Sequence, residues 1–264
     1  MPVLLSSLYK YRRFVWNHAF FEMRHRYAGT GMGVVWNVFH PLSMIVIYSI
    51  VFTTIFNPGL AGVTSKFAYT MYLCAGFFPW IAFSECVSRC CLAFSSNAAY
   101  LKKLPIPEQV FVAQTAAAAT LSLVTNFVLL LAISLAAGLR PNWHWLLLPA
   151  PLLLLQTTGF GLGMACGTLN VFFPDLAQLV GVALQVLFWM TPIVYPSATA
   201  PQWMQPILAV HPATPAIAGI RGLFLFGQSP SSEEWLAMLA WAVGSSLVGY
   251  LMLRSLRKEI RDLL

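Results

Sequence analysis

Residues 31–56, GMGVVWNVFHPLSMIVIYSIVFTTIF, decide the fold of this chain, because they form a long apolar stretch without Asp, Glu, Lys or Arg. A helix crosses the hydrocarbon core of a membrane in about 20 residues. The stretch therefore predicts a first membrane-spanning helix. Arg24, His25 and Arg26 lie directly before it. Basic residues that flank a span tend to stay in the cytoplasm, so the chain is predicted to begin inside the cell.

The composition of the whole chain places it in the membrane. Of the 264 residues, 59% are hydrophobic and 9% are charged, and the mean hydropathy is +0.73. A soluble domain is about 25% charged, and one core of this size cannot hide so much apolar surface. The net charge of +7 comes from basic residues at the predicted membrane edges. It is a topology signal and gives no support to nucleic-acid binding.

Five further apolar stretches follow the first, and together they predict an all-α polytopic membrane protein with six transmembrane helices. Eleven of the 15 Lys and Arg residues fall in segments predicted to lie inside, three fall outside, and Arg89 lies within a span. This asymmetry places both termini in the cytoplasm. The later spans are expected at residues 67–93, 108–138, 145–172, 176–195 and 234–253.

The segments outside the spans have predicted roles of their own. Residues 1–30 mix aromatic residues with cations and predict an amphipathic helix in the membrane interface, so that residues 31–264 form the transmembrane domain. A short inner helix is expected near residues 95–104, before a Pro-x-Pro turn. Residues 197–227 contain apolar pieces too short to span, which predicts re-entrant or interfacial helices.

Chemistry-bearing motifs are scarce in the sequence. There is no phosphate-binding loop, no hydrolase nucleophile motif and no metalloprotease motif, so we expect no enzyme activity, cofactor or metal on this chain. Glu85 and Arg89 are spaced i,i+4 within the second span and predict an ion pair inside the membrane. The glycines between positions 159 and 167 predict close helix packing rather than nucleotide binding.

Aromatic residues are the remaining candidates for a site. They make up 14% of the chain, and many fall in the first, second and fifth spans, Phe77, Phe78 and Trp80 among them. Aromatic rings stack on sugar rings, so a pathway lined by them would let a glycan slide without tight binding. The alternative is that they face lipid or neighbouring helices. The candidates for the lining of a substrate channel are Trp36, Tyr48, Phe52, Phe188, Trp189 and Tyr195.

Several pieces of the sequence resemble one family along nearly the whole chain. The chain is similar to the permease subunits of ABC exporters of polysaccharide, the Wzm-like O-antigen exporters, with capsule and teichoic-acid permeases as relatives. Pro174 departs from the family pattern, in which a basic residue usually precedes the Asp. The matching pieces are RHRYAGTGMGVVWNVFHPLSMIVIY, FFPWIAFSECV, NAAYLKKLPIPEQVF, NVFFPDLAQLVGVALQVLFWMTPIVYP, HPATPAIAGIRGLF and the IRDLL tail.

The resemblance implies a fold and a set of partners. It implies the ABC exporter permease fold in the bacterial inner membrane. The permease would be a homodimer paired with two copies of a separate Wzt-like subunit, which would bind ATP and magnesium. The substrate would be a polysaccharide on an undecaprenyl-pyrophosphate carrier, and the membrane lipid would be a further partner. No nucleic-acid partner is expected.

The resemblance also implies roles for particular residues. The helix at 95–104 would couple the permease to the ATPase through Tyr100, Leu101, Lys102 and Lys103. Residues 197–227 would form a periplasmic gate that includes His211 and Arg221. Arg24 and Arg26 would hold the pyrophosphate headgroup, because the planar guanidinium donates two parallel hydrogen bonds to phosphate. The alternative for these two arginines is a topology signal alone.

Two other function classes remain open from the sequence. A drug or small-lipid exporter of the same permease superfamily would need no aromatic pathway. A membrane-embedded transferase would need a catalytic carboxylate or histidine at the membrane face, and His40 and Glu85 are the only candidates. Each of these two residues stands alone in the sequence.

Overall fold

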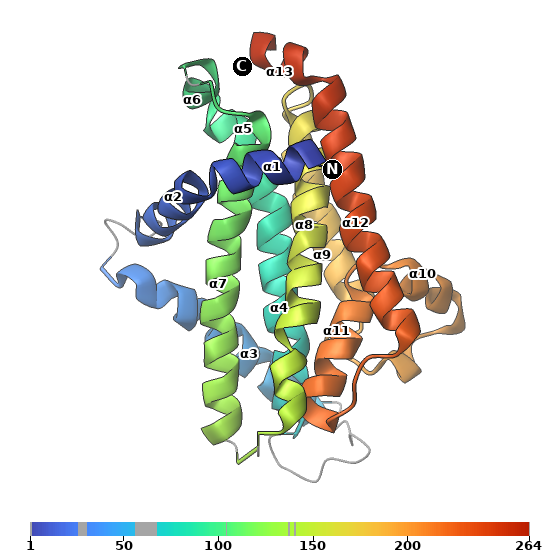
Figure 1. Ribbon diagram of the computed structural model, residues 1–264. Helices are drawn as coiled ribbons and strands as arrows, with labels where there is room; N and C mark the ends of the chain where they lie inside the picture. The colour runs from blue at the N-terminus through green and yellow to red at the C-terminus, as the bar shows by residue number, and fades with distance from the viewer. Residues whose placement is uncertain are drawn as a thin grey trace.

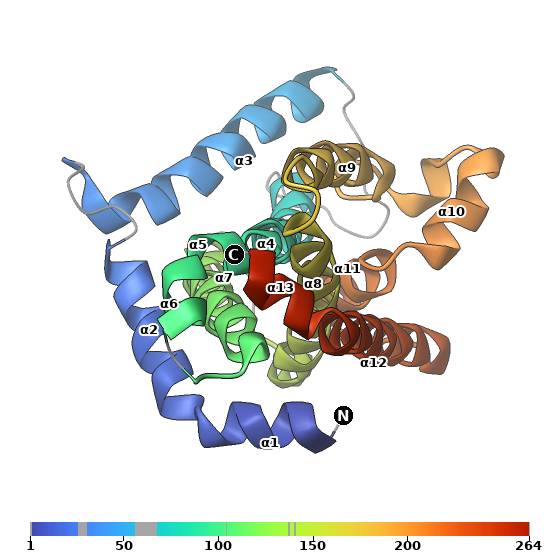
Figure 2. The same ribbon diagram turned by 90° about the horizontal axis from the view of Figure 1, so that it is seen from above.

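The computed structural model describes residues 2–25, 31–55, 68–103, 105–136, 138–139 and 141–263, and every regular element in these ranges is a helix (Figure 1). Four long helices form the bundle at the centre of the molecule. They are α4 (Ala68–Cys91), α7 (Glu108–Ala136), α8 (Pro149–Asn170) and α12 (Ser232–Ser255). Helix α8 packs between α4 and α12, and α7 packs on α4 (Figure 2).

The four bundle helices are long and apolar enough to cross a membrane, when α8 is taken together with the preceding turn η2 (Trp143–Leu147). In the ranges described, the apolar part of α3 (Trp36–Ile55), which follows the turn η1 (Gly33–Val35), is shorter, and so is α9 (Leu176–Met190). The structure confirms an all-helical membrane protein with four candidate spans, or five if a bent pair described below counts as one. The count of six stays a prediction.

One end of the bundle gathers a group of cations, among them Lys102, Lys103, Arg257 and Arg261. The short helices α5 (Ala93–Ser96), α6 (Ala98–Lys103) and α13 (Arg257–Leu263) gather there, with the C-terminus beside them (Figure 1). The predicted N-terminal helix is present as α1 (Pro2–Lys10) and α2 (Arg12–His25), separated at Tyr11. Helix α1 runs across the bundle axis, and α2 packs on α7. This end is the one predicted to face the cytoplasm.

The predicted gate segment folds into short helices. It contains the turns η3 (Ser197–Thr199) and η4 (Gln202–Met204), then α10 (Gln205–Val210), α11 (Thr214–Arg221) and the π-helical turn η5 (Gly222–Phe226). The two apolar halves of this segment meet at an angle of 92°. Helix α11 packs on α4, α8 and α12, while α10 lies at the edge of the molecule (Figure 2).

Glycines bring the central helices together, as the sequence predicts. A Cβ atom at Gly167 would lie 2.6 Å from the carbonyl oxygen of Cys90 on α4. Gly159 and Gly163, at helical spacing from Gly167, face the same helix. Gly161 points the other way, toward the backbone of α12. The glycines of α8 therefore serve packing on two sides, as small residues do between membrane helices.

Candidate functional site

Three helix faces meet in a groove between α3, α4 and α9. On α3 the groove is lined by His40, Met44 and Tyr48, which are spaced by four residues and share one face. The α4 and α9 faces repeat this helical spacing and bring both aromatic and polar side chains to the same space. Their lining residues are Phe77, Trp80, Ile81, Ser84 and Ser88 on α4, and Gly181, Leu184, Gln185, Phe188 and Trp189 on α9.

Five rings form the aromatic part of this groove, and Phe188 is at their centre. The ring centroid of Phe188 lies 6.0 Å from those of both Phe77 and Trp80. Tyr48 stacks on Phe188 at 6.3 Å with an interplanar angle of 26°. The ring of Trp189 meets Phe188 edge-on at 5.2 Å. We call this cluster and the space beside it the aromatic groove.

The aromatic groove encloses a volume of about 480 Å³, and its walls are both apolar and polar. The rings offer flat faces, while His40, Ser84, Ser88 and Gln185 offer hydrogen-bonding groups along the same space. Gly181 adds no side chain, and a Cβ atom there would meet nothing within 4 Å. Rings that stack and side groups that hydrogen-bond match the two kinds of surface on a sugar unit. The groove therefore suits a carbohydrate better than a purely apolar ligand.

The structure brings together some of the predicted channel residues and separates others. Tyr48, Phe188 and Trp189 line the aromatic groove. Trp36 lies at the start of α3, edge-on to Phe39 at 5.7 Å, and is not among the lining residues. The hydroxyl of Tyr195 donates to the carbonyl of Met190 at 2.8 Å, so this residue caps the end of α9. The side chain of Phe52 lies outside the described residues.

The sequence analysis did not select Phe77 and Trp80 as lining residues, although both belong to the cluster. A signal for them was present. Phe77, Trp80, Ser84 and Ser88 recur at spacings of three and four along α4, which marks one helix face with two rings followed by two serines. No comparable signal shows which neighbour this face meets.

The segment that follows α9 is held by side chains, because its backbone leaves the helix and is buried. The hydroxyl of Tyr69 donates to the carbonyl of Val194 at 3.0 Å, and that of Tyr72 donates to the carbonyl of Tyr195 at 3.3 Å. Arg221 donates to the carbonyls of Pro192 and Ile193, which come just before Val194 in the chain. Four consecutive carbonyls are satisfied in this way, as buried backbone groups require.

Arg221 is the positively charged side chain that binds two of these four carbonyls. Its side chain is buried and also donates to the carbonyl and the hydroxyl of Tyr72, at 3.2 and 2.8 Å. The guanidinium lies 3.6 Å from the centroid of the Tyr72 ring. Gly76 leaves room for it, since a Cβ atom there would sit against Nη2. Arg221 thus ties α11 to α4 and to the segment after α9, and its donors are used within the protein.

His211, the second residue of the predicted gate, is also buried. Its Nδ1 accepts from the backbone N–H of Ala213 at 3.2 Å, which leaves the proton on Nε2. Nε2 lies 3.2 Å from the hydroxyl oxygen of Thr191 and donates to it. The ring lies 6.1 Å from that of Trp80. His211 therefore connects the bend between α10 and α11 to the end of α9 and to the aromatic groove.

The predicted ion pair on α4 is present and has a third member. Arg89 Nη1 donates to Glu85 Oε1 at 2.7 Å, and Nη2 pairs with Glu22 on α2. The second carboxylate links the N-terminal helix to the bundle, and sequence spacing gives no sign of it. Of the predicted headgroup residues, Arg26 and the side chain of Arg24 lie outside the described residues.

The predicted coupling residues divide into two groups. Tyr100, Lys102 and Lys103 are exposed on α6. Leu101 is only 2% exposed and packs in the core with Phe94 and other apolar residues. Leu101 therefore anchors the segment in the core of the chain, and its role in coupling stays a prediction.

A buried carboxylate, Glu108, fixes the base of α7 beside this coupling segment. Glu108 is fully buried and pairs with Arg257 at 2.6 Å and with Arg261 at 2.5 Å. Its neighbour Gln109 accepts from Arg257 at 2.9 Å and donates to Ser7 at 2.8 Å. The N-terminal helix, the start of α7 and the C-terminal tail are joined through these contacts. Sequence analysis placed Glu108 only at the beginning of a span.

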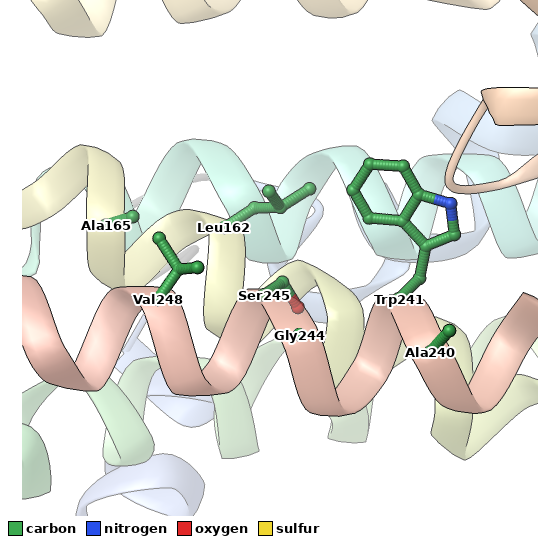
Figure 3. Close-up of a pocket in the computed structure, with 7 residues that line it drawn as sticks. All are labelled: Leu162, Ala165, Ala240, Trp241, Gly244, Ser245 and Val248. Atoms are coloured by element: carbon green, nitrogen blue, oxygen red, sulfur yellow. The ribbon is translucent and has the colours of Figure 1, made fainter.

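A second cavity, between α8 and α12, has a different character. It encloses about 380 Å³ and is lined mainly by small or apolar side chains, which Figure 3 shows from α8 and α12. The hydroxyl of Ser245 is turned to the carbonyl of Thr158, at 3.3 Å. No aromatic cluster surrounds this cavity in the part of the chain that the structure describes. Its surface suits acyl chains rather than sugars.

Comparison with known proteins agrees with a membrane transport role. The profile of the ABC-2 type transporter family matches residues 19–225. The O-antigen export system permease protein RfbA of Myxococcus xanthus is 26% identical over 261 residues, which is 98% of each chain. Two O-antigen export system permease proteins RfbA of Klebsiella pneumoniae are 27% and 25% identical, over 78% and 92% of each chain. Since the family match covers most of its length, this chain belongs to the ABC-2 type transporter family.

Proposed function

We propose that this chain is the permease subunit of an ABC transporter that exports O-antigen polysaccharide. The observation that carries the proposal is its similarity, over 98% of each chain, to a permease named for O-antigen export. The aromatic groove supports it independently, because stacked rings beside polar side chains suit a chain of sugars. We assign the glycan path to this groove.

The transport path requires a second copy of the chain. Helices α3 and α9, which line the groove, lie at the edge of the bundle (Figure 2), and both carry exposed apolar residues. A homodimer that brings the two grooves face to face would enclose the glycan and cover these residues. In such a dimer α3 and α9 also cross the membrane, which gives six spans with both termini in the cytoplasm of a bacterial inner membrane. The exposed residues include Val46, Ile47 and Ile50 on α3, and Leu179, Val182 and Val186 on α9.

The energy for export would come from a separate Wzt-like ATPase subunit, two copies of which would bind ATP and magnesium. Tyr100, Lys102 and Lys103 offer it an exposed surface at the cationic end of the bundle. The ion pairs of Glu108 support this arrangement, because they fix the start of α7 to the tail beside α6. Only residues 104–107 separate α6 from α7, so a movement imposed on α6 would reach α7.

The substrate would enter on an undecaprenyl-pyrophosphate carrier. Arg24 and Arg26 precede the first predicted span and are the proposed pyrophosphate ligands. Their guanidinium groups supply the bidentate donors that a phosphate accepts. The gate segment, residues 197–227, is the proposed exit on the opposite side, and Arg221 and His211 position it against α9.

The test of this proposal is export in cells that lack the chromosomal copy of this permease. The intact chain should restore polysaccharide at the cell surface. Gly181→Leu should reduce surface polysaccharide at least several-fold, because the new side chain enters the groove where the structure leaves open space. The measurement is the amount of surface polysaccharide by antibody binding, compared with the amount retained inside the cell.

Gly244→Leu is the matched control for Gly181→Leu. Gly244 also lies within a helix, and a Cβ atom there also meets nothing within 4 Å, but it lines the cavity between α8 and α12. Export should remain normal in this variant. Failure of the intact chain to restore surface polysaccharide would refute the proposed function. Equal export by the two leucine variants would remove the aromatic groove from the path.

A further inference from the structure

A third cavity lies at the cationic end, between the N-terminal helix α2 and the segment that contains α5 and α6 (Figure 1). It encloses about 460 Å³. Helix α7 forms its floor through Gln114 and Thr115, and Arg89 of α4 lies at its side. This cavity shares no lining residue with the aromatic groove and includes neither Glu108 nor its arginine partners. It is therefore a separate site.

One polar atom in the cavity has no partner. Gln114 is 5% exposed, and its Oε1 accepts no hydrogen bond. The orientation of the amide is fixed by a short chain of bonds. Asn97 Nδ2 donates to the carbonyl of Ala93 at 2.8 Å, so Asn97 Oδ1 faces Gln114 and accepts from its Nε2 at 3.1 Å. The oxygen of Gln114 is therefore left as a buried acceptor, which costs free energy unless a donor fills the cavity.

The other polar groups around the cavity also favour a ligand that donates hydrogen bonds. The hydroxyl of Thr115 gives its proton to the carbonyl of Phe111 at 3.1 Å, so its oxygen is free to accept. The guanidinium of Arg89 is held by the carboxylates of Glu22 and Glu85. Two carboxylates around one guanidinium leave a net negative charge beside the cavity. This charge repels phosphate and favours an uncharged ligand with several hydroxyl groups.

Rings at the mouth of the cavity supply the apolar half of a sugar site. The ring of His18 on α2 lies 6.5 Å from that of Tyr100 on α6, at an interplanar angle of 76°. Phe21 lines the same opening from α2. Tyr100 is 53% exposed, so its ring is accessible to a ligand. Rings at the mouth and acceptors at the floor match the C–H face and the hydroxyl groups of a sugar unit.

We infer that this cavity is a sugar-binding subsite at the cytoplasmic end of the permease, where a glycan makes contact before it reaches the aromatic groove. The inference rests on the proposed function, since it takes the transported polysaccharide as the ligand. Gln114 Oε1 and Glu22 accept from sugar hydroxyls, and the exposed ring of Tyr100, packed edge-on against His18, stacks on the sugar ring. The pyrophosphate would remain outside this subsite because of the two carboxylates.

The test measures binding directly on the full-length chain in lipid nanodiscs. The probe is the O-antigen polysaccharide of the source bacterium, released from its lipid by mild acid. Saturation-transfer NMR should show magnetisation passing from the protein to the sugar protons. Gln114→Met keeps the size of the side chain and removes the buried acceptor, and His18→Ala removes one ring. Each variant should bind about tenfold more weakly, as expected for the loss of one hydrogen bond or stacking contact.

Gln156→Met is the control, because Gln156 is also a buried glutamine with an unpartnered side-chain atom but lines a different cavity, between α7, α8 and α12. It should bind the probe as the intact chain does. Two results would overturn the subsite and leave the proposed function standing. In the first, the intact chain exports polysaccharide in cells but transfers no saturation to the probe. In the second, all variants transfer saturation equally well. A third result would also overturn the subsite: the His18→Ala variant no longer co-purifies with the ATPase subunit, while its saturation transfer to the probe is unchanged. The cavity would then be a binding site for the ATPase subunit.

Discussion

At the scale of single residues, the buried guanidinium of Arg221 is the contact on which the position of the gate segment depends. It reaches three carbonyls and a hydroxyl, on α4 and on the segment after α9. A lysine keeps the charge but has one nitrogen, so it cannot reach acceptors that lie in several directions. Arg221→Lys should therefore leave at least one buried carbonyl unpaired and lower the free energy of unfolding by roughly 2–3 kcal/mol.

Arg254→Lys provides the comparison for this prediction, because Arg254 is exposed near the end of α12. Thermal unfolding of the two variants in detergent, followed by tryptophan fluorescence, should show a fall of several degrees for Arg221→Lys. The midpoint of Arg254→Lys should stay near that of the intact chain. Equal midpoints for both variants would mean that the Arg221 contacts contribute little to stability.

At the scale of helices, the glycines of α8 decide how closely the bundle packs. A Cβ atom at Gly163 would overlap the Cβ of Cys90 and lie 3.2 Å from the carbonyl of Val87. Gly163→Ala should therefore force α4 and α8 apart and destabilise the protein by about 1–3 kcal/mol. Gly244→Ala has open space and should be neutral or stabilising by up to about 1 kcal/mol through helix propensity.

The opposite signs expected for these two alanine variants can be checked by thermal unfolding under identical conditions. A lower midpoint for Gly163→Ala and an unchanged or higher one for Gly244→Ala would support the close approach of α4 and α8. Equal midpoints would contradict it. The experiment separates packing from helix propensity, because both variants make the same chemical change within a helix.

Most helix positions were predictable from sequence, because burial in lipid imposes long apolar runs with polar interruptions. The expected spans at 67–93, 108–138 and 234–253 correspond to α4, α7 and α12 with small shifts at their ends. The length of α9 was less predictable. Its expected span at 176–195 ends early, at Met190, because the backbone leaves the helix at Thr191 and the carbonyl of Pro192 then accepts from the side chain of Arg221.

The candidate site was predictable only in part, because it depends on which helix faces meet. Tyr48 and Phe188 were expected to line a path, but the sequence does not show that Phe77 and Trp80 lie against them. Leu101 illustrates the same limit, since its position in a short polar helix gives no sign that it points into the core. The partner of Arg89 on α2 is 67 residues away, beyond any local spacing rule.

At the scale of the whole molecule, four features are arranged along the bundle. The sugar subsite and the exposed surface of α6 lie at the cationic end, the aromatic groove runs between α3, α4 and α9, and the gate segment closes on α9 through His211 and Arg221. This order gives a glycan a route from the cytoplasmic end to the opposite side. The central claim is that the polysaccharide passes through the aromatic groove.

The most direct test of this claim is photo-crosslinking in exporting cells. A photoreactive phenylalanine analogue placed at position 181 projects into the groove, and one placed at position 244 projects into the cavity between α8 and α12. After illumination, the permease carrying the analogue at 181 should shift in mass and react with antibody to the polysaccharide, whereas the permease carrying it at 244 should not. A polysaccharide adduct at 244, or none at 181 in cells that still export, would contradict the claim.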